Sequence, residues 1–363
     1  MQHGAPLERF GFVGLPNSGK TSLHNALAGG DAVAARHAFS TRSATVGVAK
    51  VPDGRLPRLA EMSSSRRTVH ASVQFTDIGG LVSGSSRGEG LGNAFLGHVR
   101  DTDAIVYVLR AFADPDVPGD DDPLDSLRVL ETELALADLD SATRQLGKLA
   151  RALKGDPSLR ASHDLLARAV ATLEDGLPLY RSGLDDSERT GLRPFFMLTN
   201  KPVLAVVNIG EDRIADAEEL ASPVREELGD AEVVPLCVQL EAEAAQLDEV
   251  ERPEVLAALG LGSGALDRFL ASAYHLLGLR TFLTTGPKES RAWTFRAGAS
   301  AVECAGAVHS DIQRGFIRAD TIAYDDLLDA GSWVAAQRQG RVRSEGKDYL
   351  MADGDVVEFR FNV

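Results

Sequence analysis

The sequence predicts an α/β fold around a parallel sheet, with a helical segment inserted into it and a smaller α+β segment after it. Two continuously apolar runs, residues 104–109 and 201–208, are typical of central parallel strands that are covered on both faces. Between them, leucines three and four residues apart indicate two antiparallel helices, at about 124–154 and 159–173. From residue 284 onward short strands and turns replace this pattern, which favours a separate α+β domain.

The composition is that of a globular chain with room for two or three domains. It has 363 residues, of which 44% are hydrophobic, and no run of about 18 apolar residues. Because Met1 to Arg9 also lacks the apolar stretch of a secretory signal, we expect no membrane span and no export. Cys237 and Cys304 lie far apart, which fits buried, unpaired thiols in a reducing cytoplasm.

The net charge bears on the partners of the chain. A charge of −15 argues against a general nucleic-acid binder, because phosphate backbones attract clustered Lys and Arg. The basic string at residues 337–343 is either a local basic patch or a solvated loop.

The stretch Gly14-Leu15-Pro16-Asn17-Ser18-Gly19-Lys20-Thr21 carries the clearest chemistry. It follows the apolar run 10–13 and precedes a helix-compatible segment, which is the strand, loop and helix context of a phosphate-binding loop. Glycines at both ends let successive N–H groups face one anion, and the helix adds its positive N-terminus. We expect Lys20 to reach the β- and γ-phosphates and the Thr21 hydroxyl to bind Mg²⁺. The alternative is a tight strand-to-helix turn that happens to match.

Two further segments are candidates for sensing a bound nucleotide. Thr41 lies between this loop and the next strand, where it is either a second Mg²⁺ contact or an ordinary turn residue. Asp77 ends a short alternating strand at 73–76, and a carboxylate in that position can hold Mg²⁺ through water. The many glycines of segment 81–93 predict a loop that is mobile without a ligand, and a static flexible loop is the alternative.

The tetrapeptide Asn208-Ile209-Gly210-Glu211 follows the second apolar strand, at the edge where a nucleotide base would lie. Asn208 can hydrogen-bond a purine or brace the phosphate loop, and Glu211 can accept from base N–H groups. Guanine-specific switches carry Asn-Lys-x-Asp here, whereas this chain has Ile209 in place of the lysine and Glu211 in place of the aspartate. Losing a paired polar contact in a base pocket lowers selectivity by orders of magnitude, so adenine becomes a candidate.

These segments together resemble the YchF family of Obg-related P-loop ATPases, over nearly the whole chain. The motifs that carry the resemblance are GFVGLPNSGKTSLHNAL for the phosphate loop, DIGGLVSGSSRGEGLGNAFLGHVRDTDAIVYVLRAF for the second switch, ETELALADLD for the helical insertion, and RAWTF, GFIRADTIAYDD, EGKDY and DGDVVEFRFNV for a C-terminal TGS domain.

The resemblance implies an architecture and a biochemical class. It implies a P-loop NTPase domain of the Ras-like G-domain type at residues 9–112 and 193–282, an inserted antiparallel helical domain at 113–192, and a β-grasp-like TGS domain at 283–363. It also implies a cytosolic protein that hydrolyses ATP in preference to or alongside GTP and associates with ribosomes, through ribosomal RNA or protein. We expect a monomer.

The resemblance also assigns site residues by position. The phosphate contacts are Asn17, Ser18, Gly19, Lys20, Thr21 and Ser22, the Mg²⁺ ligands are Thr21, Thr41 and Asp77, and the base contacts are Asn208, Ile209 and Glu211. Asn17 stands where related GTPases help to hold K⁺ beside the phosphates, and bracing of the loop is the alternative role.

Some positions depart from what catalysis would need. Leu81 occupies the place of the glutamine that orients the attacking water in Ras-like switches, and a leucine cannot do that. Tyr107 stands where many members of the family have a histidine, and tyrosine is a poor base at neutral pH. The segment after Thr41 lacks the Ile-Glu-Pro-Asn of the family, so only Thr41 is transferred. The catalytic group is unknown, and we expect intrinsic turnover to be slow.

The leading hypothesis is an Mg²⁺-dependent nucleotide switch in which ATP orders the loops at Thr41 and 77–93 and slow hydrolysis releases them. One rival is a nucleotide-gated binding module, with GTP as its ligand or with negligible hydrolysis. A small-molecule kinase is a third class, but no acceptor-binding lid with clustered arginines supports it.

Overall fold

A computed structural model describes residues 8–28, 45–78, 91–114, 119, 121–247, 251–259, 261 and 264–362 of the chain. The chain divides into two compact units. The larger unit is Arg9–Val48 with Gln74–Phe269, and the smaller unit is Met1–Glu8, Ala49–Val73 and Leu270–Val363. None of the described helices is both long and apolar enough to cross a membrane.

The larger unit is built on a six-stranded sheet with the order β2-β4-β1-β5-β6-β7. Its strands are β1 (Arg9–Val13), β2 (Thr45–Lys50), β4 (Ser72–Asp77), β5 (Ala104–Ala111), β6 (Val203–Ile209) and β7 (Val233–Leu236). The pairs β1–β4, β1–β5, β5–β6 and β6–β7 are parallel. Because β1 is central, the loop at its carboxyl end lies where the strand order reverses, which is where open α/β sheets bind ligands. The predicted α/β fold is confirmed.

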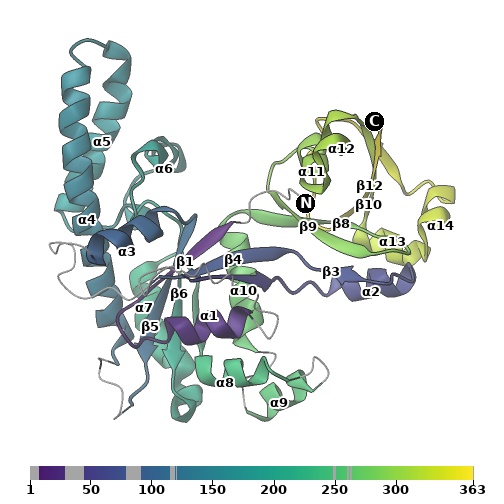
Figure 1. The fold of residues 1–363 in the computed structure, drawn as a ribbon, viewed down its shortest axis with the longest axis horizontal. Coiled ribbons are helices and arrows are strands. Elements are labelled where there is room, and N and C mark those ends of the chain that lie inside the picture. The colour runs from purple at the N-terminus through teal and green to yellow at the C-terminus, as the bar shows by residue number, and fades with distance from the viewer. Residues whose placement is uncertain are drawn as a thin grey trace. The chain divides into compact units, whose positions relative to one another are not determined.

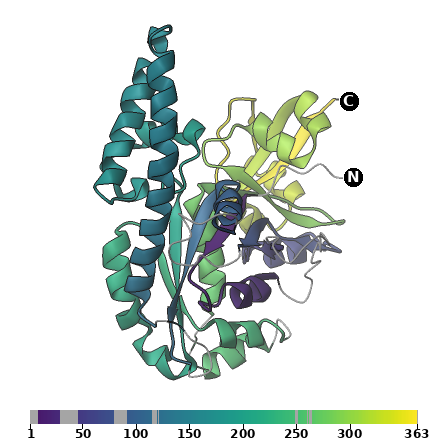
Figure 2. The same cartoon turned by 60° about the vertical axis from the view of Figure 1, so that its left-hand side comes forward.

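Helices cover both faces of this sheet (Figures 1 and 2). They are α1 (Lys20–Ala28), α3 (Leu91–Arg100), α4 (Pro123–Ala152), α7 (Ala217–Leu228), α8 (Val238–Ala244) and α10 (Ala265–Leu276), with the 3₁₀ helix η5 (Glu211–Asp216) before α7, and α9 (Arg252–Ala258) packs against α8. Apolar side chains of α3, α4 and α7 share one core with β5 and β6. On the other face, Phe75 of β4 packs against Phe269 of α10, and Phe12 of β1 meets His24 of α1 edge to face.

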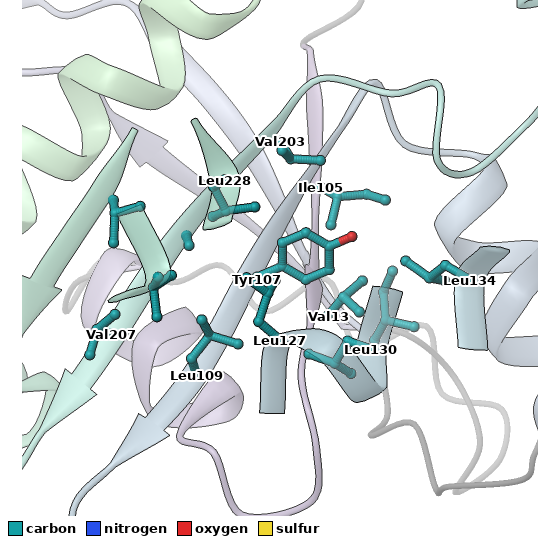
Figure 3. Packing of buried hydrophobic residues seen from close by; sticks show 14 of the residues in the cluster. Val13, Ile105, Tyr107, Leu109, Leu127, Leu130, Leu134, Val203, Val207 and Leu228 are labelled. Carbon is teal, nitrogen blue, oxygen red and sulfur yellow. The ribbon is translucent and has the colours of Figure 1, made fainter. Parts of the chain in front are cut away.

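The two predicted central strands are buried along their whole length, as continuous apolar runs predict. Tyr107, in the middle of β5, lies among aliphatic side chains of the neighbouring strands and of α4, with Val13, Leu127 and Leu130 around it (Figure 3). Truncating one of these buried leucines to alanine would cost about 2–5 kcal/mol of stability.

The insertion contains the predicted helical hairpin. α4 and α5 (Arg160–Glu174) run side by side and extend away from the sheet of this unit (Figures 1 and 2). The Asp122 carboxylate caps α4 by accepting from two backbone N–H groups, and Pro123 takes the first helical position, where no N–H is needed. The chain turns at the predicted break, where Asp156 caps the short 3₁₀ turn Pro157–Leu159. The segment is completed by η3 (Leu179–Arg181), α6 (Asp186–Gly191) and η4 (Arg193–Phe195).

A buried carboxylate on α4 ties the hairpin to the segment before β6. Asp138 is 1% exposed and accepts from the N–H of Leu198 at 2.8 Å and from the N–H and the hydroxyl of Thr199, both at 2.7 Å. Three donors offset the cost of burying this group. The position of the hairpin on its sheet is therefore fixed by polar as well as apolar contacts.

The smaller unit holds a second six-stranded sheet, with the order β11-β10-β12-β8-β9-β3. Its strands are β3 (Thr68–Val69), β8 (Leu279–Thr284), β9 (Ser290–Arg296), β10 (Phe316–Ala323), β11 (Arg343–Glu345) and β12 (Asp355–Phe361), and its helices are α2 (Arg55–Met62), α11 (Ala301–Val308), α12 (Ser310–Arg314), α13 (Tyr324–Ala330) and α14 (Trp333–Arg338). The last strand, β12, pairs parallel with β8 and antiparallel with β10. This arrangement is the predicted β-grasp type.

Residues 49–73 belong to the smaller unit, although the sequence suggested no such grouping. β3 pairs with β9, and Arg55 of α2 bonds Asp353 at 2.9 Å. A strand of two residues carries no alternation that sequence reasoning can detect. The proposed division into three domains stays a prediction.

Both cysteines are buried and unpaired, as predicted. Burial raises the pKa of the Cys304 thiol to about 12, and it also raises the pKa of Cys237. Thiols held in the protonated form are poor nucleophiles, so neither is a candidate catalytic group.

Candidate functional site

The phosphate-loop sequence forms the link between β1 and α1, as predicted. Two of its residues, Asn17 (φ 62°) and Gly19 (φ 95°), have left-handed backbone conformations. A Cβ atom on Gly14 would lie 2.5 Å from the carbonyl oxygen of Val108, and one on Gly19 would lie 2.3 Å from Nδ2 of Asn208. Glycine is therefore needed at both ends of the loop, by close packing at Gly14 and by both packing and conformation at Gly19.

Lys20 lies at the start of α1 with its ammonium group turned back into the loop. Its Nζ donates to the carbonyl oxygens of Gly14 (3.1 Å) and Leu15 (2.8 Å). Burial lowers the pKa of Lys20 to about 8, against the opposing effect of the Asp77 carboxylate, which raises it. The hydrogen bonds of this buried ammonium go to neutral carbonyls. An anion such as a triphosphate that binds beside it therefore stabilises the charged form of the lysine.

Thr21 and Asp77 meet next to this lysine. The Thr21 hydroxyl donates to the Asp77 carboxylate at 2.7 Å, and Asp77 is placed there because it ends β4, directly beside Phe12 of β1. The two predicted Mg²⁺ ligands are thus adjacent, and both offer the oxygen atoms that Mg²⁺ prefers. Among the described residues no cluster of three or more His, Cys, Asp or Glu could hold a metal. A pair of oxygens that relies on substrate phosphates and water for the remaining ligands is the usual Mg²⁺ site of nucleotide enzymes, so the residues fit this ion.

Asn208 uses both ends of its amide inside the protein. Nδ2 donates to the carbonyl oxygen of Ser18 at 3.0 Å, and Oδ1 accepts from the N–H of Val238 at 3.2 Å. The side chain is 5% exposed. This geometry is the bracing alternative. Asn208, near the end of β6, joins the phosphate loop that follows β1 to the start of α8 that follows β7.

The other two predicted base contacts differ in exposure. Ile209 is buried in the core that contains Tyr107, whereas Glu211 is exposed at the start of η5. Of the three predicted base contacts, only Glu211 presents its side chain to solvent. Whether any of them meets a base stays a prediction.

Two residues beside this segment were missed by sequence reasoning. Arg110 pairs with Asn208 in the β5–β6 ladder, and its guanidinium lies 4.5 Å from the ring centre of Phe112. A Cβ atom on Gly210 would approach Phe112 to 3.3 Å, so these groups border the edge of the predicted base site. The apolar run that identified β5 ends before both of them, which left no signal in the sequence pattern.

Tyr107 lies inside the core, not in the loop. No described group is in hydrogen-bonding geometry with its hydroxyl. Burial, with a further contribution from the Glu131 carboxylate, raises the pKa of Tyr107 far above its usual value. The Glu131 carboxylate accepts hydrogen bonds from the Tyr180 hydroxyl and from Nη2 of Arg181, the latter at 2.6 Å. Tyr107 is thus a packing residue next to a buried polar group at the base of the hairpin.

Two predicted residues lie outside the described part of the chain. They are Thr41, the candidate second Mg²⁺ contact, and Leu81, which stands at the position of the water-orienting glutamine.

Comparisons with known proteins give two matching family models and relatives of similar length. Residues 9–141 match the family MMR_HSR1, described as a 50S ribosome-binding GTPase, and residues 279–362 match YchF-GTPase_C, described as a protein of unknown function (DUF933). The chain is 41% identical to the ribosome-binding ATPase YchF of Bacillus subtilis over 361 residues, which is 97% of this chain and 99% of the relative. It is 42% identical to the protein of the same name from Haemophilus influenzae over 359 residues, with the same coverage.

A solved structure is similar over the same length. The YchF GTPase of Schizosaccharomyces pombe has a TM-score of 0.85 and 28% identity to this chain, covering 99% of this chain and 100% of that one. The resemblance expected from the motifs therefore holds for the whole sequence and for the fold. The chain belongs to the YchF family of P-loop nucleotide-binding proteins.

Proposed function

We propose that the chain is an Mg²⁺-dependent nucleotide-switch ATPase that converts ATP to ADP and phosphate slowly and acts in a ribosome- or translation-associated process. The observation that supports this most is the geometry around the phosphate loop, where the Lys20 ammonium bonds to loop carbonyls and Thr21 bonds to Asp77. The bacterial relatives are named ribosome-binding ATPases, and they match this chain end to end.

The residues have distinct roles in this proposal. Backbone N–H groups of the loop and the Lys20 ammonium bind the phosphates, and they neutralise charge that develops during transfer to water. Thr21 and Asp77 hold Mg²⁺, with Thr41 as a further ligand. Mg²⁺ supplies charge neutralisation at the phosphates. Asn17 is a candidate contact for K⁺. Asn208 keeps the loop in its binding shape.

We expect slow turnover because two positions that supply polar groups for hydrolysis in other switches do not supply them here. Leu81 offers no polar group to orient water, and Tyr107 is buried in the core. Adenine is favoured because Ile209 and Glu211 replace the guanine-reading pair. The rival with the strongest support is a nucleotide-gated binding module in which GTP is the ligand or hydrolysis is negligible.

The test is a competition titration of ATP against GTP on the purified protein, followed by phosphate release with and without Mg²⁺, K⁺ and ribosomes. Lys20→Ala is the control for binding through the loop. We expect ATP to displace GTP, and phosphate release to be slow, Mg²⁺-dependent and lost in the control. Tight GTP with weak ATP would reject the adenine assignment, and no phosphate release under any condition would favour the binding module.

A further inference from the structure

The short helix α9 in the larger unit exposes apolar side chains to solvent. From Val255 to the C-cap residue Leu259 the chain reads Val-Leu-Ala-Ala-Leu. Five consecutive residues make more than one turn of a helix, so apolar side chains surround it here. Only Leu256 is buried, at 2% exposure, whereas Val255 and Leu259 are 37% and 38% exposed, and Ala257 and Ala258 are also exposed. A helix that is apolar all round is normally covered on every side.

Three of these side chains lie on one face of the helix. Val255, Ala258 and Leu259 stand at i, i+3 and i+4, which makes them neighbours on the helix surface. We call these three residues the α9 face. Leu256 lies off this face and packs toward Gly264, where an added Cβ atom would come within 3.1 Å of its Cδ1 atom. α9 packs on α8 at the margin of the larger unit (Figure 1), so the described chain buries one side of α9 and leaves the α9 face open.

The segment around the α9 face is strongly acidic. Residues 238–259 contain six Asp or Glu and one Arg, a formal charge of −5. Glu251 and Glu254 stand four residues before Val255 and Ala258, so each borders a member of the face. Both glutamates are exposed. No cation among the described residues lies at ion-pair distance from either carboxylate, so their charges are free to meet a partner.

This charge decides which kind of molecule can cover the α9 face. A nucleic acid or an anionic membrane would bring its phosphates against the carboxylates. A second copy of the chain in a two-fold contact would bring the same carboxylates against one another. A protein segment with Lys or Arg around an aliphatic centre avoids both conflicts, because interfaces combine an apolar centre with a polar rim.

We propose that the α9 face is a docking site for a basic amphipathic helix of a partner protein. Aliphatic side chains of that helix pack on Val255, Ala258 and Leu259, and its lysines or arginines pair with Glu251 and Glu254. The spacing of the face is that of a ridge on which a second helix packs, and recognition of such helices through i, i+3 and i+4 anchors is a common mode. This interaction is separate from the proposed nucleotide chemistry, because no residue of the face belongs to the nucleotide site.

The first test removes the apolar centre in the full chain. The variant is V255Q/L259Q, in which glutamine keeps the helix propensity and makes both positions polar. The matched control is V129Q/L136Q on α4, whose two side chains are 36% and 40% exposed. The probe is a fluorescent peptide of about 18 residues, made of leucine and lysine with leucines at helical spacing. A peptide of the same composition in scrambled order is its control, and binding is measured by anisotropy.

We expect the wild type to bind the amphipathic peptide at least tenfold more tightly than the scrambled peptide. V255Q/L259Q should lose about tenfold in affinity, and V129Q/L136Q should stay within about twofold of the wild type. Hydrogen exchange of residues 251–259 should slow when the peptide binds. Equal affinity of the wild type and V255Q/L259Q would overturn the proposal, and so would an equal loss in V129Q/L136Q.

The second test removes the acidic rim. E251Q/E254Q is compared with E219Q/E226Q on α7, which also replaces two exposed glutamates. Between about 50 and about 200 mM KCl, the affinity of the wild type for the peptide should fall, and the fall should be smaller in E251Q/E254Q than in its control. The same salt dependence in both variants would reject a basic partner.

Two further measurements complete the test. Sedimentation of the wild type and V255Q/L259Q reports a second copy as the occupant: a dimer that V255Q/L259Q abolishes would overturn the proposal. Melting temperature and ATP binding of all variants should equal those of the wild type, so failure of the docking proposal leaves the proposed function standing. If V255Q/L259Q melts well below the wild type, E251Q/E254Q decides alone, because both of its positions are exposed.

Discussion

Nucleotide affinity should fall as the pH rises above 8, because of the environment of Lys20. The perturbation is pH alone. Burial lowers the pKa of this lysine to about 8 in the protein without nucleotide. A bound triphosphate favours the charged ammonium and returns its pKa toward or above the ordinary value of about 10.4. Binding then takes up a proton whenever Lys20 is neutral beforehand.

The magnitude follows from the linkage between protonation and binding. The observed Kd rises by a factor of 1 + 10^(pH − 8) while the bound form stays charged, which gives about 1.1 at pH 7, about 2 at pH 8 and about 11 at pH 9. The elevenfold loss corresponds to about 1.4 kcal/mol. The phosphates do not contribute over this range, because their second ionisation lies near pH 6.

The assay is a titration with a non-hydrolysable ATP analogue and Mg²⁺ between pH 7 and 9.5. Calorimetry at pH 8.5 in two buffers of different ionisation enthalpy should report the uptake of a fraction of a proton. Lys20→Met is the control, and its weaker affinity should not vary with pH. An affinity that stays flat to pH 9.5 in the wild type, or a decline of the same size in Lys20→Met, would refute the reasoning.

The same linkage predicts how the free energy of unfolding changes with pH. A lysine whose pKa is lower in the folded than in the unfolded chain binds fewer protons when folded. The free energy of unfolding should therefore increase as the pH rises from about 8 to about 10.4, which is opposite to the trend in nucleotide affinity. Two opposite trends from one residue are a stricter check than either alone.

Three further substitutions test the site. Asn208→Ala should weaken the binding of ATP and of GTP by the same factor. It should also lower the free energy of unfolding by about 1–3 kcal/mol, because it leaves the Ser18 carbonyl and the Val238 N–H without their partner. A change in the ratio of ATP to GTP affinity, measured by competition titration, would indicate base contact instead. Asp77→Asn should raise the Mg²⁺ concentration needed for half-maximal phosphate release at least tenfold, with smaller effects on Mg²⁺-free nucleotide binding, and equal Mg²⁺ curves would remove Asp77 from the site. Tyr107→Phe should leave phosphate release within twofold and the melting temperature within a few degrees, because the hydroxyl has no hydrogen-bond partner among the described residues; a loss of hydrolysis above tenfold would restore a catalytic role.

The parts of the fold that could be predicted are those whose signal is local. The central strands showed as continuous apolar runs, and the hairpin showed as leucine spacing with an Asp-Pro break. The phosphate loop was readable because backbone conformation there depends on residue type, as the positive φ of Gly19 shows. Each of these features needs only neighbouring residues to be recognised.

The parts that could not be predicted depend on distant backbone groups. β3 has two residues and pairs with β9, more than 200 residues later. The sequence left both roles of Asn208 open, because the partners of its side chain are a backbone carbonyl and a backbone N–H, which leave no side-chain pattern. Arg110 and Phe112 follow the apolar run 104–109, which was the only signal for this strand, although the strand itself continues to Ala111.

The phosphate half of the site is built in advance, and this limits where selectivity between nucleotides can arise. Lys20, Thr21 and Asn208 all make their contacts within the protein, so the loop has its binding shape before a nucleotide arrives. A shape that recognises only phosphate binds ATP and GTP alike. Because the Asn208 side chain is engaged within the protein and Ile209 lies in the core, we expect discrimination between the bases to depend most on Glu211, the exposed one of the three predicted base contacts. Exchange of Glu211 for Gln should therefore alter the ATP/GTP ratio while leaving the pH dependence set by Lys20 intact.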